Sequence, residues 1–401
     1  MSLFRSLTHR SFAFLWSGQT ISRLGDSLYR IALAWWVLEK TGSAAIMGTV
    51  LIFSFLPMLV FLLIGGVAVD RLPRGRVMLA SDLLRGTLVA SIAVLAFTQA
   101  LDIWHVYIAS MVFGFVDAFF QPAYTAIVPE IVPSEMLPSA NSLTNLSGKI
   151  TGIVGPALGA SIVALGGTPI AFALDAASFF ISAICLVPII GLIVRPAEKS
   201  ASVIGDLRDG LSTVLGTPWL WLTIAIFALA NITMDGPIAV SLPFLVKDSL
   251  NADVSALGWL YSMSSLGAIV GAIWLGRFPR IRRRGILTYG AGIVSALMVV
   301  VAGLPISLSG VLIVMFIEGA CVATFGLIWT NTLQEMVPRE RLGRVSSIDM
   351  LGSYVLLPIG YGMTGWVTDL IGAPLVFIFG GAIGAMMIAL GLLHPAIRGL
   401  D

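Results

Sequence analysis

The sequence has little charge: only 11% of its 401 residues are Asp, Glu, Lys or Arg, whereas 58% are hydrophobic. Its mean hydropathy is +0.98. A soluble domain carries roughly 25% charged residues. The chain therefore has too few polar side chains to cover a globule in water, and a lipid bilayer is the solvent that suits it.

Cysteine and histidine are also scarce. Cys185 and Cys321 are the two cysteines and both lie inside apolar runs, so no disulfide framework follows from them. The three histidines, His9, His105 and His394, each lie near an expected membrane boundary. The sequence has no metal-binding spacing of His or Cys and no ATP-binding Walker loop. We therefore expect no metal and no cofactor, and a membrane enzyme remains only an alternative, because the acids are scattered over several apolar runs.

Long apolar runs dominate what is present. A membrane-spanning helix needs about 20 mostly apolar residues, and about twelve such stretches occur here. Only helices or closed barrels satisfy the backbone in hydrocarbon, and these runs are too long for barrel strands. We predict an all-α membrane protein with twelve transmembrane helices. The expected spans are 12–38, 43–69, 76–99, 103–128, 139–165, 169–194, 218–246, 255–276, 285–304, 308–335, 344–370 and 373–394.

The longest polar connection divides these spans six and six. We predict an N-terminal six-helix bundle over residues 1–194, a cytoplasmic linker over 195–217 and a C-terminal six-helix bundle over 218–401. The linker contains "VIGDLRDGLSTVL", which has the character of a short helix lying on the inner membrane surface.

The distribution of Lys and Arg predicts the orientation, because these residues concentrate in cytoplasmic loops. Seventeen of the 23 lie in one alternating set of loops, and only Lys40 and Lys247 lie in the other set. We expect a multi-pass protein of the inner (plasma) membrane with both termini in the cytoplasm. The basic loops are short and topology explains them, so we expect a lipid partner and no nucleic acid.

The two halves of the chain resemble each other. "EIVPSEML" (130–137) and "EMVPRERL" (335–342) align 205 residues apart. "GDSLYRIALAWWVL" aligns with "MDGPIAVSLPFLVK" 209 residues apart, which matches Asp26 to Asp235. Chance similarity between apolar segments is the alternative, but two polar anchors at nearly one offset argue against it. Transporters built from parallel repeats show such a duplication, so we predict two pseudo-symmetric bundles.

The loop between the second and third spans carries a recognisable motif. The segment "GGVAVDRLPRGRVMLASDLLRG" resembles the Gly-x-x-x-Asp-Arg-x-x-Arg-x-Arg signature of the major facilitator superfamily. The second half keeps a degenerate copy with Arg277 but no aspartate. "GIVGPALG" resembles the Gly-Pro motif of antiporters in that superfamily. The signature matches at Gly66, Asp70, Arg71, Arg74 and Arg76, and the antiporter motif at Gly152, Gly155, Pro156 and Gly159.

Over the whole chain, the sequence resembles the drug:proton antiporter branch that contains macrolide-efflux proteins and enterobactin exporters. The resemblance implies a monomeric secondary transporter that moves a small-molecule substrate by alternating access. In this branch it implies efflux of amphipathic, drug-like molecules, coupled to protons. A siderophore or lipid exporter, or a facilitator with different coupling, is the alternative within transport.

The resemblance also implies a cytoplasmic gate. The superfamily's aspartate, here Asp70, latches the inner side of the protein, and the arginines of the signature brace it. Asp82 and Arg85 are three residues apart at the start of the third span, so we expect them to join this network. The alternative is that the arginines serve only topology. The Gly-Pro motif is implied to resist ion leakage, and simple helix packing explains its glycines equally well.

The first span contains charges that a lipid-facing helix does not tolerate. Arg23, Asp26 and Arg30 share one helical face, and each charge at mid-bilayer costs a few kcal/mol unless it is paired or wet. One hypothesis is a structural ion pair. The other is that Asp26 alternates between an arginine and a proton, and so couples transport to the proton gradient. Asp235 is a second candidate because its neighbours Asn231 and Thr233 are uncharged.

Further polar and aromatic residues lie in spans expected near a substrate cavity. Bulky amphipathic molecules suit aromatic surfaces. For each residue, a structural contact is the alternative to a cavity role, and the same holds for Asp175 in the sixth span. The cavity candidates are Asp117, Gln121, Glu318, Lys149, Asn231, Trp36, Phe113 and Tyr124.

Overall fold

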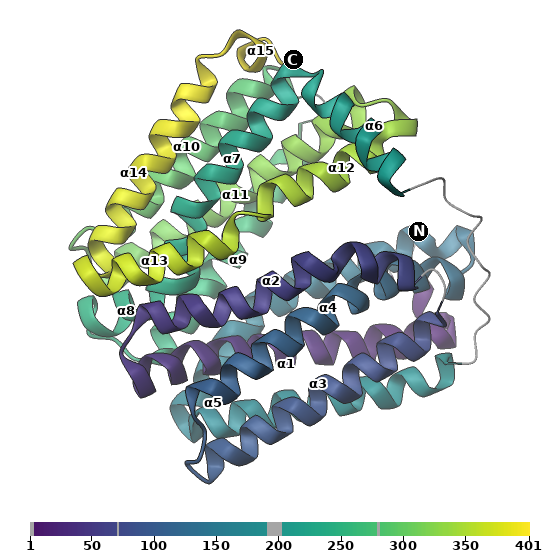
Figure 1. Ribbon diagram of the computed structural model, residues 1–401, viewed down its shortest axis with the longest axis vertical. Coiled ribbons are helices and arrows are strands. Elements are labelled where there is room, and N and C mark those ends of the chain that lie inside the picture. Colours follow the sequence, from purple (N-terminus) through teal and green to yellow (C-terminus); the bar gives the residue numbers. More distant parts are fainter. Residues whose placement is uncertain (1–3, 70–71, 191–202, 279–280) are drawn as a thin grey trace. The chain divides into compact units, whose positions relative to one another are not determined.

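The computed structural model describes residues 4–69, 72–190, 203–278 and 281–401 (Figure 1). It divides into two compact units. The first takes in the described parts of Met1–Gly42, Thr49–Glu198 and Asp253–Gly258, and the second those of Ser43–Gly48, Lys199–Ala252 and Trp259–Asp401. Helices make up both units, as the apolar runs predict.

Five long helices build most of the first unit. Short 3₁₀ turns η1 (Arg5–Thr8), η2 (Ser134–Met136) and η3 (Val187–Ile189) accompany them. The helix α5 packs along both α1 and α3, and α3 also packs on α4 (Figure 1). The long helices are α1 (Arg10–Thr41), α2 (Ala44–Val69), α3 (Arg74–Phe97), α4 (Ile103–Ile131) and α5 (Leu137–Leu186).

The second unit begins with the linker helix α6 (Val203–Leu215), which covers the segment expected to form a short helix. In this unit α10 packs along both α11 and α14, while α7 packs on α13, α14 and α12 (Figure 1). The other elements are α7 (Pro218–Gly236), η4 (Pro237–Ser241), α8 (Leu242–Phe244), η5 (Leu245–Ser249), α9 (Val254–Leu275), α10 (Arg284–Ala302), α11 (Leu308–Met336), α12 (Arg339–Tyr354), α13 (Leu357–Ile371), α14 (Ala373–Leu392) and α15 (Pro395–Arg398).

Among the described residues, nine helical segments are long and apolar enough to cross a membrane. One of them, Ser134–Ile189, is 56 residues long and contains the fifth expected span and the sixth as far as Ile189. Its backbone breaks at Gly167, whose φ of 78° only glycine adopts without strain. This break falls between the expected spans 139–165 and 169–194.

Two further differences from the expected spans have physical causes. Polar and charged residues interrupt α1, so it is not among the nine. The expected span 344–370 is divided between α12 and α13, which have 16 and 15 residues and are each too short to cross alone. The count of twelve spans therefore remains a prediction, while the all-helical membrane fold is confirmed.

Small residues let α5 approach α1 closely in the first unit. A Cβ atom at Gly155 would lie 2.5 Å from the Cβ of Ser27, and one at Gly159 would lie 3.0 Å from the Cα of Leu28. Backbones packed this tightly are typical of membrane helices with small residues at the contact. These contacts agree with the helix-packing explanation of the Gly-Pro motif. A role of the motif in resisting ion leakage stays a prediction.

A valine at position 155 is expected to destabilise the first unit, because its side chain needs the space that Ser27 occupies. Overpacking of this kind costs about 1–3 kcal/mol. The matched control is Gly290→Ala in α10, where a Cβ atom meets nothing within 4 Å. Thermal unfolding of the purified protein should show a lower Tm for Gly155→Val and an unchanged or higher Tm for Gly290→Ala. Equal Tm values for the two variants would contradict the close contact.

Candidate functional site

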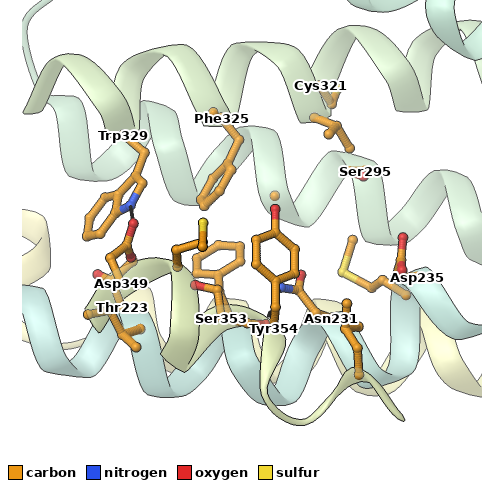
Figure 2. Close-up of a pocket in the computed structure, with 18 of the residues that line it drawn as sticks. Thr223, Asn231, Asp235, Ser295, Cys321, Phe325, Trp329, Asp349, Ser353 and Tyr354 are labelled. Atoms are coloured by element: carbon orange, nitrogen blue, oxygen red, sulfur yellow. Dashed lines mark hydrogen bonds between the residues drawn. The ribbon is translucent and has the colours of Figure 1, made fainter. Parts of the chain in front are cut away.

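The second unit contains a cavity of about 560 Å³ (Figure 2). Small-molecule sites in proteins have volumes of about 300–1,000 Å³, so the cavity is large enough for a drug-sized ligand. The helices α7, α10, α11 and α12 supply nearly all of its lining. The polar residues that line it are Thr223, Asn231, Asp235, Ser295, Glu318, Cys321, Trp329, Thr330, Asp349, Ser353 and Tyr354.

Three of these residues are acids, and each accepts a hydrogen bond from a neutral donor. Tyr361 donates its hydroxyl to Asp235 at 2.8 Å. Ser264 donates to Glu318 at 3.1 Å. The indole Nε1 of Trp329 donates to Asp349 at 3.1 Å. None of the described residues that line the cavity is Lys, Arg or His. The cavity therefore holds three carboxyl groups and no basic side chain.

The apolar part of the wall combines aromatic rings and methionines with aliphatic residues. Phe227 and Phe325 pack with their ring centroids 4.3 Å apart, and both line the cavity. Met234 and Met350 also line it. Figure 2 shows the rings of Phe325 and Tyr354 in the central part of the cavity. Such a wall suits a ligand with large apolar groups, because flexible thioethers and flat rings adapt to irregular shapes.

The structure brings three of the predicted residues together here: Asn231, Asp235 and Glu318 all line the one cavity. Asp235 lies near the middle of a 32-residue helical run, Pro218–Ser249. It is the last residue but one of α7, and the π-helical segment η4 follows. Local π-helical geometry is often found at functional sites. The amide of Asn231 donates to the Ser353 carbonyl at 3.3 Å, so Asn231 is not the partner of Asp235.

The first unit contains a second group of buried charges, centred on Arg85. Its guanidinium lies 2.8 Å from Asp82 and 3.2 Å from Asp117. The same guanidinium stacks over two rings, 4.1 Å from the centroid of Phe120 and 4.8 Å from that of Phe179. Asp82 is fully buried, and Arg85 is 4% exposed. One arginine thus compensates two acids in the interior of the bundle.

The structure leaves the expected network of Asp82 and Arg85 with the gate aspartate untested. The sequence groups them with the gate aspartate Asp70, but Asp70 and Arg71 lie outside the described residues. In the structure Asp82 accepts a hydrogen bond from the hydroxyl of Ser182 at 2.7 Å. The described contacts of Arg85 run to Asp82 and to the cavity candidate Asp117.

Of the two hypotheses for the charged face of α1, the described residues show no ion pair at Asp26, and a role for Asp26 in proton coupling stays a prediction. The described residues place no basic group within 4.0 Å of Asp26. Arg23 instead stacks over the Tyr124 ring at 5.1 Å, and Arg30 donates to the Ser27 hydroxyl at 3.1 Å. Asp26, like Asp235, is near the middle of a 32-residue helix.

The remaining cavity candidates of the first unit differ in their surroundings, and their role in a cavity stays a prediction. Gln121 and Lys149 are exposed, and Trp36 is half-buried. Phe113 stacks on Tyr29 with ring centroids 5.4 Å apart, which is a packing contact. Asp175 is fully buried, and its Oδ2 atom has no hydrogen-bond partner among the described residues.

Of the gate arginines, Arg74 and Arg76 lie in the first turn of α3. Gly66 lies in α2, and Arg76 is exposed. Arg74 forms an ion pair with Glu130, and Arg284, near the start of α10, forms one with Glu335. Glu130 and Glu335 are the first residues of the two repeated motifs. In each unit, the first glutamate of the repeated motif thus forms an ion pair with an arginine of the neighbouring helix.

Sequence reasoning missed several lining residues. Asp349 is an acid inside an expected span, and the criterion that selected Asp235 and Glu318 also applies to it. For Trp329 and Tyr354, the sequence shows only that the residues are aromatic, which does not distinguish a cavity-lining residue from other aromatic residues. Tyr361, the hydrogen-bond partner of Asp235, is 126 residues away in sequence, and only the packing of α13 on α7 brings the two together.

Sequence comparison finds relatives over almost the whole chain. The profile of the Major Facilitator Superfamily matches residues 15–348 and 226–398. Macrolide efflux protein A of Streptococcus pyogenes is 26% identical over 396 residues, covering 96% of each chain. Multidrug efflux pump Tap of Mycolicibacterium fortuitum is 29% identical over 94% of each chain. Enterobactin exporter EntS of Escherichia coli O1:K1 / APEC is 28% identical over 95% of this chain and 86% of the exporter.

Solved structures of transporters share the fold. A bacterial homologue of the iron transporter ferroportin, in an inward-facing state, has a TM-score of 0.73 and 16% identity, covering 95% of this chain and 98% of its own. A POT family transporter in complex with 5-aminolevulinic acid has a TM-score of 0.74 and 12% identity, covering 96% of each chain. At such identities the likeness shows the fold alone.

Proposed function

Because the chain belongs to the Major Facilitator Superfamily of membrane transporters, we propose that it exports amphipathic small molecules and that an inward flow of protons drives the export. Its relatives carry the names of a macrolide efflux protein, a multidrug efflux pump and an enterobactin exporter. The proposal also includes a monomer in the plasma membrane with both termini in the cytoplasm. The excess of Lys and Arg in one set of loops supports this orientation.

The observation that carries the proposal is the cavity of the second unit. Ionisable side chains within membrane helices are costly and normally mark a substrate or ion pathway. Here Asp235 and Glu318 line a cavity whose wall also contains four aromatic residues and two methionines. A carboxyl group without a basic neighbour can bind and release a proton, and an apolar wall can hold an amphipathic molecule. The cavity therefore contains residues suited to binding a proton and residues suited to binding the exported molecule.

The proton gradient supplies enough energy for export. Moving one proton inward across 100 mV is favoured by about 2.3 kcal/mol, to which the pH difference adds. This free energy supports roughly tens-fold accumulation outward for each proton exchanged, since 1.4 kcal/mol corresponds to about tenfold. Asp235 in the second unit and Asp26 in the first are the proposed proton carriers, and each is near the middle of its helical run.

The proposal is tested by transport in proteoliposomes with an imposed pH gradient. When the lumen is acidic, an antiporter should accumulate a labelled macrolide above the level of protein-free liposomes, which corrects for passive trapping of a weak base. An ionophore that dissipates the gradient should abolish this excess. Uptake by the protein that is the same with and without the gradient would rule out proton coupling, and would leave a facilitator as the function.

A further inference from the structure

The charge of the cavity carries an inference about its ligand, which rests on the proposed export function and narrows its substrate class. We propose that the cavity of the second unit selects organic cations, and that Asp349 is the counter-ion of the bound cation. Three acids and no bases line this cavity among the described residues. The first unit differs, because Arg85 compensates Asp82 and Asp117 there.

The acids are divided between two ends of the cavity. Figure 2 shows Asp349 beside Trp329 at one end and Asp235 at the other, with Tyr354 and Asn231 between them. Glu318 precedes Trp329 by 11 residues in α11, about 16 Å along the helix axis, so it lies away from the Asp349 end. The cavity thus has one end with a single acid, Asp349, and two further acids beyond that end.

The single acid has the surroundings that a cation-binding site requires. One oxygen of Asp349 accepts the indole N–H of Trp329, and among the described residues the other oxygen has no recorded hydrogen-bond donor. This bond fixes the carboxylate and leaves one oxygen for a ligand. The ring of Trp329 lies at this end of the cavity, and the rings of Phe325 and Tyr354 follow towards its centre. A cation over an aromatic face gains about 0.5–2 kcal/mol, in addition to its attraction to the carboxylate.

A buried hydroxyl independently indicates that the cavity holds a ligand. Ser295 in α10 lines the cavity and is 2% exposed. Its hydroxyl has no hydrogen-bond partner among the residues that the structure describes. Buried polar groups in native proteins are normally satisfied by protein, water or ligand. The cavity wall thus contains an unpartnered buried polar group in addition to its acids.

Electrostatics then decides which substrates enter. A carboxylate in a cavity of low polarity needs a proton or a cation nearby, because an isolated buried charge is costly. An anion would meet three acids, so repulsion excludes it. Protons and an organic cation compete for these groups, and cation affinity should fall as the pH is lowered. The titratable groups that line the cavity are Asp235 from α7, Glu318 and Cys321 from α11, and Asp349 and Tyr354 from α12.

Tetraphenylphosphonium and tetraphenylborate test the inference, because they have nearly the same shape and opposite charge. Binding of each ion to purified protein in nanodiscs is measured, and binding to empty nanodiscs is subtracted. We expect saturable binding of the cation and none of the anion. Asp349→Asn should weaken cation binding at least tenfold. The control Asp248→Asn removes an exposed acid of η5 that does not line the cavity, and should bind like wild type.

The outcomes separate the inference from the proposed function. Equal binding of the two ions, or cation binding that Asp349→Asn leaves unchanged, would overturn the inference even if gradient-driven transport occurs. Conversely, selective cation binding that depends on Asp349, without any gradient-driven flux, would uphold the inference and overturn proton-coupled export. The thermal unfolding of each variant is measured alongside, so that a loss of binding is not mistaken for a loss of fold.

Discussion

Asp235→Asn is expected to reduce gradient-driven accumulation in proteoliposomes to the level of protein-free liposomes. Asparagine keeps the shape of the side chain and can still bond to Tyr361, but it cannot take up and release a proton. Without that step the free energy of the proton gradient, about 2.3 kcal/mol per proton at 100 mV, no longer drives the substrate. The measurement is uptake of labelled substrate with an acidic lumen, in wild type and variant.

A second assay distinguishes uncoupling from general damage. Exchange of labelled for unlabelled substrate across the membrane needs no net movement of protons, so Asp235→Asn should retain it. The control Asp248→Asn should keep both exchange and accumulation, because this exposed acid lies outside the cavity. If Asp235→Asn accumulates substrate as wild type does, Asp235 does not carry the coupled proton.

Arg85→Gln is expected to cause the largest loss of stability among substitutions in the first unit. The variant leaves Asp82, which is fully buried, and Asp117 without their shared positive charge. Removing one partner of a buried ion pair costs about 3–5 kcal/mol. The stacking of the guanidinium on Phe120 and Phe179 is lost as well. Unfolding of the purified variant, followed by temperature or denaturant, measures the change.

Two comparisons identify the cause of that loss. Arg344→Gln breaks a pair with Asp209 whose side chains are 37% and 66% exposed, and exposed pairs contribute at most about 1 kcal/mol. Adding Asp82→Asn and Asp117→Asn to Arg85→Gln removes the uncompensated acids and should restore most of the stability. A triple variant no more stable than Arg85→Gln would show that the arginine acts through packing rather than charge.

The apolar runs predicted the helical fold well because a bilayer dictates the length of each spanning helix. The gap expected between residues 165 and 169 coincides with the break at Gly167. The division between α12 and α13 was missed, because the sequence stays apolar through Val355 and Leu356. A run of apolar residues indicates that a segment lies in the bilayer, but it does not indicate where the helix is interrupted.

The site was predicted only in part, because tertiary packing chooses the partner of each polar residue. Asp26 and Arg30 share a helical face, yet the structure directs Arg30 to Ser27. Arg85 and Asp117 are 32 residues apart and meet only where α3 packs on α4. A single residue whose charge is costly to place in the bilayer, such as Asp235, can be identified from the sequence. The hydrogen-bond partner of such a residue cannot be identified in this way.

The native cysteines permit the most direct test of the central claim, that the cavity of the second unit is open to water and binds the exported molecule. Cys321 lines the cavity, and Cys185 is the other cysteine of the chain. In a Cys185→Ser variant that still transports, the rate at which a hydrophilic thiol reagent modifies Cys321 is measured with and without substrate. We predict that the reagent modifies Cys321 and that saturating substrate slows the reaction at least tenfold. A Cys321 thiol that stays unreactive, or that reacts equally fast with substrate present, would contradict the account.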